Sequence, residues 1–326
     1  MSQAPTPTPE AAPGPTATPE VSGRSPWELF RRRFRRDRIA LLGLGFLVVL
    51  VLLALFAPVI ADHVIGRGPN ELNRKALSDI GLPQVGPGRA YWGGVDTSGR
   101  DVFLRTLYGA RTSLTVALLA TGIATAIGVV MGLVAGYYRG KIDTVISRTI
   151  DLFLSLPVLL FSIGIAATCS ITAEGCLGGF VQPGISLVVL IISLFTWSYM
   201  ARIVRGQVLS LREKEFVEAA RSLGSPTSRI LFREILPNLA APIIVYSTLV
   251  IPSNILFEAA LSYLGVGIPP ETPSWGRMIA EASRGQLFTV AWWMLFFPGV
   301  ALVLTTLAFN LLGDGLRDAL DPRTQG

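Results

Sequence analysis

Long apolar runs without a single charge restrict most strongly how this chain can fold. Residues 39–61 form one such run, and residues 112–138 form another. A helix needs about 20 apolar residues to cross the roughly 30 Å hydrocarbon core of a bilayer. We therefore expect an all-α, polytopic membrane protein with six transmembrane helices. The six expected spans are 39–61, 112–138, 151 to about 173, 184–201, 239–268 and 290–312.

The composition supports a membrane protein and argues against several other classes. Hydrophobic residues make up 51% of the chain and charged residues 15%, whereas soluble domains carry about 25% charged residues. The net charge of +6 is attributed to membrane orientation and lipid contact, so we expect no nucleic-acid partner. The single histidine, His63, argues against a histidine-rich metal or catalytic site.

Arginine and lysine positions predict the orientation. If the N-terminus is cytoplasmic, the inner segments carry 19 of the 28 basic residues, and such an excess marks the cytoplasmic side. Both termini, including a C-terminal segment 313–326, are then cytoplasmic. The exception is the predicted extracytoplasmic loop 62–111, which holds seven basic residues; we discount it because the loop is long and the cluster before the first span is denser.

The chain before the first span divides into two parts. Residues 1–25 are rich in Pro, Thr and Ala and are predicted to be a disordered tail, because they can bury little apolar surface. In 26–38, Trp27, Phe30 and Phe34 fall on one helical face and the rest is basic. This pattern predicts a helix lying in the membrane interface, in contact with lipid; the alternative is a plain charged stop before the span.

The two cysteines, Cys169 and Cys176, fall at or near the predicted extracytoplasmic loop after the third span. That compartment is oxidising and six residues separate the cysteines, so a disulfide is feasible. Two free thiols are the open alternative.

Two features inside the spans have more than one interpretation. Gly128, Gly132 and Gly136 lie one turn apart and permit close helix packing, either within the chain or against a second subunit. Glu258 is a charge at membrane depth, which should face protein or a water-filled path. We name Glu258 and Asn254 as candidate translocation-path residues; the alternative for Glu258 is bonding to a neighbouring helix.

The most informative stretch is the charged segment 202–238, which predicts helix, break, helix. The first helix is expected to end at Leu223, because Gly224 can adopt the left-handed conformation that ends a helix. Ser225 is a candidate cap for the next helix, Pro226 suits its first turn, and Pro237 marks the entry to the fifth span.

These residues resemble the EAA loop of ABC import permeases. The matching positions are Glu218, Ala219, Ala220, Gly224, Leu236 and Pro237. The family pattern has Ile two places before the Leu, where this chain has Glu234. Residues 95–114, 258–279 and 309–323 closely resemble the C-type permease subunit of dipeptide, oligopeptide and nickel transporters, and the resemblance covers nearly everything from residue 25 onward.

The resemblance implies a fold and a set of partners. The fold is that of a type I ABC importer permease, with a coupling helix that docks in a cytoplasmic ATPase subunit. The implied partners are a second permease subunit in a heterodimer, two ATPase subunits and an extracytoplasmic substrate-binding protein, all at a bacterial cytoplasmic membrane. The chain is then a transport subunit and not an enzyme.

The lysine positions agree with a motor in trans. None of Lys75, Lys141 and Lys214 completes a P-loop, which needs Gly, four residues, then Gly-Lys-Ser/Thr. We therefore expect no cofactor on this chain, with ATP and Mg on the ATPase partners. Di- or oligopeptides are the expected substrates, and nickel or another small solute is the alternative. A secondary transporter would need several ionisable groups in its spans, and a membrane enzyme would need clustered catalytic side chains.

Overall fold

A computed structural model describes residues 26–169, 175–179 and 181–320 of the 326-residue chain. The predicted disorder of 1–25 and the C-terminal residues 321–326 lie outside the described residues. The described part is helical, with isolated β-bridges but no strand. The main helices are α1 (Pro26–Phe34), α2 (Arg38–Val59), α3 (Val102–Tyr138), α4 (Gly140–Ser155), α5 (Val158–Cys169), α6 (Ile185–Leu211), α7 (Glu215–Ser222), α8 (Thr227–Arg229), α9 (Leu236–Tyr263), α10 (Trp275–Ser283) and α11 (Trp293–Leu320).

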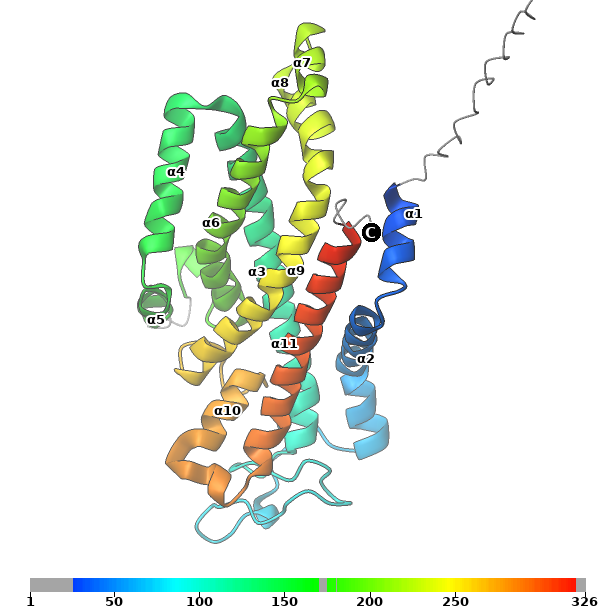
Figure 1. Ribbon diagram of the computed structural model, residues 1–326. Helices are drawn as coiled ribbons and strands as arrows, with labels where there is room; N and C mark the ends of the chain where they lie inside the picture. Colours follow the sequence, from blue (N-terminus) through cyan, green and yellow to red (C-terminus); the bar gives the residue numbers. More distant parts are fainter. Residues whose placement is uncertain (1–25, 170–174, 180, 321–326) are drawn as a thin grey trace, which may run out of the picture.

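The helices form an elongated bundle with two different ends (Figure 1). One end, called the α7 end below, carries α7, α8, α1 and the last turns of α11. The opposite end, called the α10 end, carries α10 and the long connection between α2 and α3. The first and last described helices therefore reach the same end of the bundle.

Five continuous helical segments of the described chain are long and apolar enough to cross a membrane. The third expected span differs from its prediction, because α4 and α5 form a pair bent by 87°. Pro157 follows Leu156, whose extended backbone (ψ 138°) ends α4. A residue before proline is pushed out of the helical region. The bundle thus has six spans only if this broken pair is counted as one.

The predicted loop 62–111 is shorter than expected, because α3 begins at Val102. The Asp101 carboxylate accepts a hydrogen bond from the Leu104 amide at 3.1 Å and caps the helix. Arg105 and Arg111 consequently belong to α3. Two other helix ends differ from their predicted positions. Helix α9 ends at Tyr263, before the predicted end at residue 268, and α11 continues through Leu320 into the predicted C-terminal segment 313–326.

The glycine face of α3 packs within the chain. A side chain at Gly128 would meet the Met200 Cβ at 2.6 Å, and one at Gly136 would meet the Val208 Cβ at 2.6 Å. Both partners lie on α6, and Gly132 meets α6 in the same way. This close approach holds α3 and α6 together as the centre of the bundle. Around that centre, α2 keeps most of its apolar surface exposed, including Leu42 at 73%, as suits a helix that faces lipid.

Candidate coupling loop and translocation path

The connection between α6 and α9 projects from the α7 end of the bundle (Figure 1). Helix α7 ends as predicted at a left-handed glycine, Gly224, with φ of +71°. The Ser225 amide donates to the Ala220 carbonyl at 3.1 Å, and the Gly224 amide donates to the Arg221 carbonyl at 3.0 Å. This pair of bonds is the Schellman motif, which satisfies the last carbonyls of a helix. The break therefore has a fixed geometry.

One side of α7 packs against the rest of the chain, and its opposite side is exposed. Val217 is fully buried in an apolar cluster that includes Ile230, Ile235 and residues of α6. Glu218 and Ala219 lie on the exposed side, and Ala220 is half-buried. Because alanine side chains are short, a partner can come close to the backbone of α7 on this side.

Two exposed apolar side chains of this loop were not predicted from the sequence. Leu223 is 85% exposed and Phe232 is 57% exposed, although both are apolar residues in a charged segment. Single exposed apolar side chains are common on protein surfaces, so Leu223 is of interest here because of its place directly before the turn at Gly224. The sequence did not distinguish these two residues from other apolar residues of the same loop, such as Val217 and Ile230, which are buried.

The remaining predicted loop residues lie closer to the bundle. Leu236 is half-buried and packs against the cluster around Val217, so the two halves of the loop are brought together. Pro237 is exposed in the first turn of α9. The expected capping role of Ser225 is wrong: Pro226 is the cap residue of α8, and no side chain makes a capping bond there.

A cavity of about 500 Å³ lies between α5, α6 and α9. Asn254 lines it together with Thr196, Tyr199, Ser253 and mostly apolar side chains. The Asn254 amide donates to Thr121 Oγ1 on α3 at 2.8 Å and accepts from Thr196 Oγ1 at 3.3 Å. The wall of this cavity is therefore uncharged and mostly apolar, with a few hydroxyl and amide groups.

A second cavity, of about 510 Å³, shares Tyr246 and Leu249 with the first and reaches Arg317 near the end of α11. The two cavities together follow α9 from the middle of the bundle towards the α7 end. A larger cavity of about 820 Å³ lies between α3, α6 and the segment before α6, and neither Asn254 nor Glu258 lines it.

Glu258 does not line any of these cavities. It is fully buried and accepts hydrogen bonds from Ser113 Oγ on α3 and from Ser262 Oγ, both at 2.8 Å. The Ser262 hydroxyl also accepts from the Ile268 amide at 3.2 Å. Glu258 thus joins α9 to α3 and to the chain leading into α10, which matches the alternative of bonding to a neighbouring helix.

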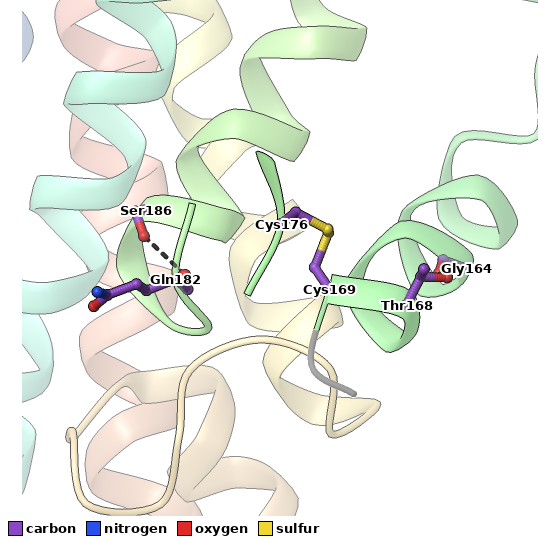
Figure 2. Close-up of a disulfide and its surroundings, with 6 residues drawn as sticks. All are labelled: Gly164, Thr168, Cys169, Cys176, Gln182 and Ser186. Carbon is purple, nitrogen blue, oxygen red and sulfur yellow. Dashed lines mark hydrogen bonds between the residues drawn. A yellow bond between two sulfur atoms is a disulfide. The ribbon is translucent and has the colours of Figure 1, made fainter. Parts of the chain in front are cut away.

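Cys169 and Cys176 form a disulfide with their Cα atoms 4.9 Å apart. It ties the end of α5 to the short segment before α6, where Ser186 donates to the Gln182 carbonyl (Figure 2). The bridge stabilises the connection at the end of the bent pair, and both cysteines line a further cavity of about 500 Å³ beside α5.

A buried ionic cluster fastens the α10 end. Arg100 contacts Asp96 at 2.6 Å and Glu281 at 3.1 Å, and Arg105 lies 3.6 Å from the same Asp96 carboxylate. Arg277 completes the cluster through Glu281 at 3.6 Å. The connection before α3, α3 itself and α10 are therefore joined by charges that are largely shielded from water. This pairing accounts for two of the seven basic residues that contradicted the charge rule.

A helical membrane bundle with a rigid protruding loop and uncharged internal cavities is the architecture expected of a transport permease. Comparison with known proteins then gives the family: residues 128–326 match the binding-protein-dependent transport system inner membrane component, and the chain belongs to that family. Residues 25–73 match the N-terminal transmembrane domain of oligopeptide transport permease C. The chain is thus a C-type permease of the oligopeptide and dipeptide transporter family and a subunit of an ABC importer, not an enzyme.

Individual relatives agree with this family. The chain is 40% identical over 303 residues to the glutathione transport system permease protein GsiD of Escherichia coli O6:K15:H31 (strain 536 / UPEC), covering 93% of this chain and 92% of the relative. The GsiD of Shigella boydii serotype 4 (strain Sb227) matches equally. Among solved structures, an inward-facing MetNI methionine ABC transporter aligns with a TM-score of 0.53 at 15% identity, covering 65% of this chain and 94% of that one; this likeness concerns the fold alone.

Proposed function

We propose that this chain, paired with a second and related permease subunit, forms the path by which di- or oligopeptides enter a bacterial cell. A separate extracytoplasmic binding protein delivers the peptide, and two ATPase subunits holding ATP and Mg drive the cycle. The relatives named for glutathione transport support a small peptide as the substrate class. Nickel or another small solute is the alternative within the family.

The observation that carries the proposal is the rigid loop at the α7 end. The buried Val217 anchors α7, the turn at Gly224 fixes its direction, and Leu223 stands exposed beside that turn. An ATPase cleft that receives α7 would bury Leu223 and contact Glu218. Because α7 is packed against the start of α9, a force on α7 is transmitted directly to the helix that lines both path cavities.

The test is the substitution Gly224→Asp. No atom lies within 4 Å of the position of an added Cβ, so the cost within this chain is backbone strain of about 1 kcal/mol. We expect normal insertion, loss of peptide uptake and weaker ATPase association. A matched control is Gly140→Asp, because Gly140 also has a positive φ of +64° and open space, but lies outside the loop. Normal transport by Gly224→Asp at normal expression would contradict the coupling role.

The path is proposed to run along α9, past Asn254 and Tyr246. Each cavity falls within the roughly 300–1,000 Å³ typical of small-molecule sites, and hydroxyl and amide groups can replace the water bonds of a peptide backbone. Asn254→Leu should lower the maximal uptake rate while leaving ATPase association unchanged. An unchanged uptake rate would remove Asn254 from the path.

The orientation is proposed to place the α7 end, and with it both termini, in the cytoplasm. Single cysteines at Ser78 and Ser228, in a background lacking Cys169 and Cys176, should then react with impermeant reagents from opposite sides. Reaction of both cysteines from one side would refute this topology. The second-subunit claim has its own test, because uptake by this chain with ATPase and binding protein alone would make the heterodimer unnecessary.

A further inference from the structure

Exposed positive charge is dense where α1 ends and α2 begins. Five arginines within eight residues have exposed side chains: Arg31, Arg32, Arg35, Arg36 and Arg38. Within the described part of the chain, none of these five makes an ion pair. The acidic residue among them, Asp37, accepts hydrogen bonds from the Ile39 and Ala40 amides at 3.0 Å, so its carboxylate is already used to cap α2.

The position of this segment relative to the lipid follows from α2. Exposed apolar side chains begin immediately after the arginines, with Ile39 at 60% and Leu42 at 73% exposure. The hydrocarbon boundary therefore lies at the start of α2. Residues 35–37, between α1 and α2, are not helical, so each of them can span up to about 3.5 Å in place of the roughly 1.5 Å of a helical residue. Arg38 therefore lies at this boundary, and Arg31 lies less than about 20 Å beyond it.

The surroundings favour lipid over protein as the partner. Helix α1 stands at the edge of the bundle, beside the end of α11 and apart from α7 (Figure 1). The next helix, α2, is the least buried of the five continuous spans: only 22% of its most apolar stretch is buried within the chain. A partner at this edge therefore lies beside a helix that this chain leaves mostly uncovered, at the level where a headgroup layer would meet α2.

We propose that residues 31–38 form a binding site for the headgroups of anionic phospholipids. The guanidinium group presents a planar fork of donors that matches phosphate oxygens. Each arginine near an anionic surface adds to the membrane attraction, so five of them make a strong local preference for anionic over zwitterionic lipid. The site goes beyond the transport function and does not depend on it, since no other subunit takes part.

The experiment measures lipids retained by the purified full-length chain. The protein is equilibrated in mixtures of phosphatidylglycerol and phosphatidylcholine, and bound lipids are counted by native mass spectrometry. Wild type should prefer phosphatidylglycerol, and Arg31→Gln/Arg32→Gln/Arg35→Gln should lower that preference on the order of tenfold. All three side chains are exposed, so the variant is expected to keep the thermal stability of the wild type.

Two controls isolate the site. Arg31→Lys/Arg32→Lys/Arg35→Lys keeps the charge and should retain most of the preference. Arg74→Gln/Lys75→Gln/Arg89→Gln removes the same charge from exposed positions near the α10 end and should bind phosphatidylglycerol like wild type. Glycerol phosphate in solution should not displace the lipid, because the site uses many headgroups held in a surface.

Three results would overturn the proposal. The glutamine variant could retain phosphatidylglycerol like wild type, or the α10-end variant could lose as much of the preference. Alternatively, the glutamine variant could lose ATPase association while its lipid preference stays unchanged, which would assign these arginines to a protein partner.

Discussion

The two ends of the bundle use arginine in opposite ways. At the α10 end, Arg100 and Arg105 are buried and lie against carboxylates. At the α7 end, Arg31 and Arg36 are exposed without an ion pair in the described part of the chain, and Arg139 pairs with Glu213 where both side chains are more than half exposed. Burial decides the difference: a buried charge without a partner is very costly, whereas an exposed one is stabilised by water and free to meet a ligand.

The largest effect is expected from removing Asp96. Its side chain is 4% exposed and is shared by Arg100 and Arg105, so Asp96→Ala leaves these two buried arginines with Glu281 as the remaining acid of the cluster. Breaking one partner of a buried pair costs about 3–5 kcal/mol. We expect a clear drop in the unfolding midpoint of the purified chain, measured by thermal or denaturant unfolding in detergent.

A control and a rescue sharpen this prediction. Asp79→Ala removes an exposed carboxylate from the same connection and should change the midpoint little. Asp96→Asn/Arg105→Met removes one charge of each sign and should recover part of the loss. If Asp96→Ala unfolds at the wild-type midpoint, the cluster does not stabilise the α10 end.

A smaller effect is expected at Glu258, which is buried but bonded to hydroxyl groups in place of cations. Glu258→Ala leaves Ser113 and Ser262 without their acceptor and opens a cavity, at a cost of about 2–3 kcal/mol. Glu258→Gln keeps the shape and one acceptor oxygen, so its midpoint should lie between those of the alanine variant and wild type. Equal midpoints for the two variants would mean that the hydrogen bonds contribute nothing.

The smallest effect is expected at the α7 end. The pair between Arg139 and Glu213 has side chains 53% and 60% exposed, and exposed pairs contribute about 0–1 kcal/mol. Arg139→Ala should therefore leave the unfolding midpoint almost unchanged in both low and high salt. A loss comparable to that of Asp96→Ala would contradict the contrast between the two ends.

The sequence predicted much of the fold because membrane spans depend on local composition. Apolar length located most of the helices, and a glycine suited to the left-handed conformation located the end of α7 at Gly224. The prediction failed where the start, end or bend of a helix depends on more than the length of the apolar run. The bend between α4 and α5 comes from Pro157, which apolar length does not register. The early start of α3 at Val102 was missed because Arg105 looks like a loop residue until its buried partners are known.

The candidate site divides in the same way. The sequence pattern identified Glu218, Ala219 and Gly224, since each is defined by residue type and spacing along the chain. It could not separate Asn254, which lines a cavity, from Glu258, which does not, because both are polar residues on the same span. It also gave no reason to select Leu223 over the buried apolar residues around it.

The sequence by itself determined the class of protein, most of the helices and the turn at Gly224, because apolar length, turn residues and motif spacing act over short stretches of chain. Only the tertiary structure decided which polar side chains are buried, which are bonded and which line the cavities. Asp96 and Glu281 are distant in the sequence yet share Arg100, and Ser113 meets Glu258 only through the packing of α3 against α9. The physical reason is that burial and pairing depend on neighbours from other helices, and packing alone selects those neighbours.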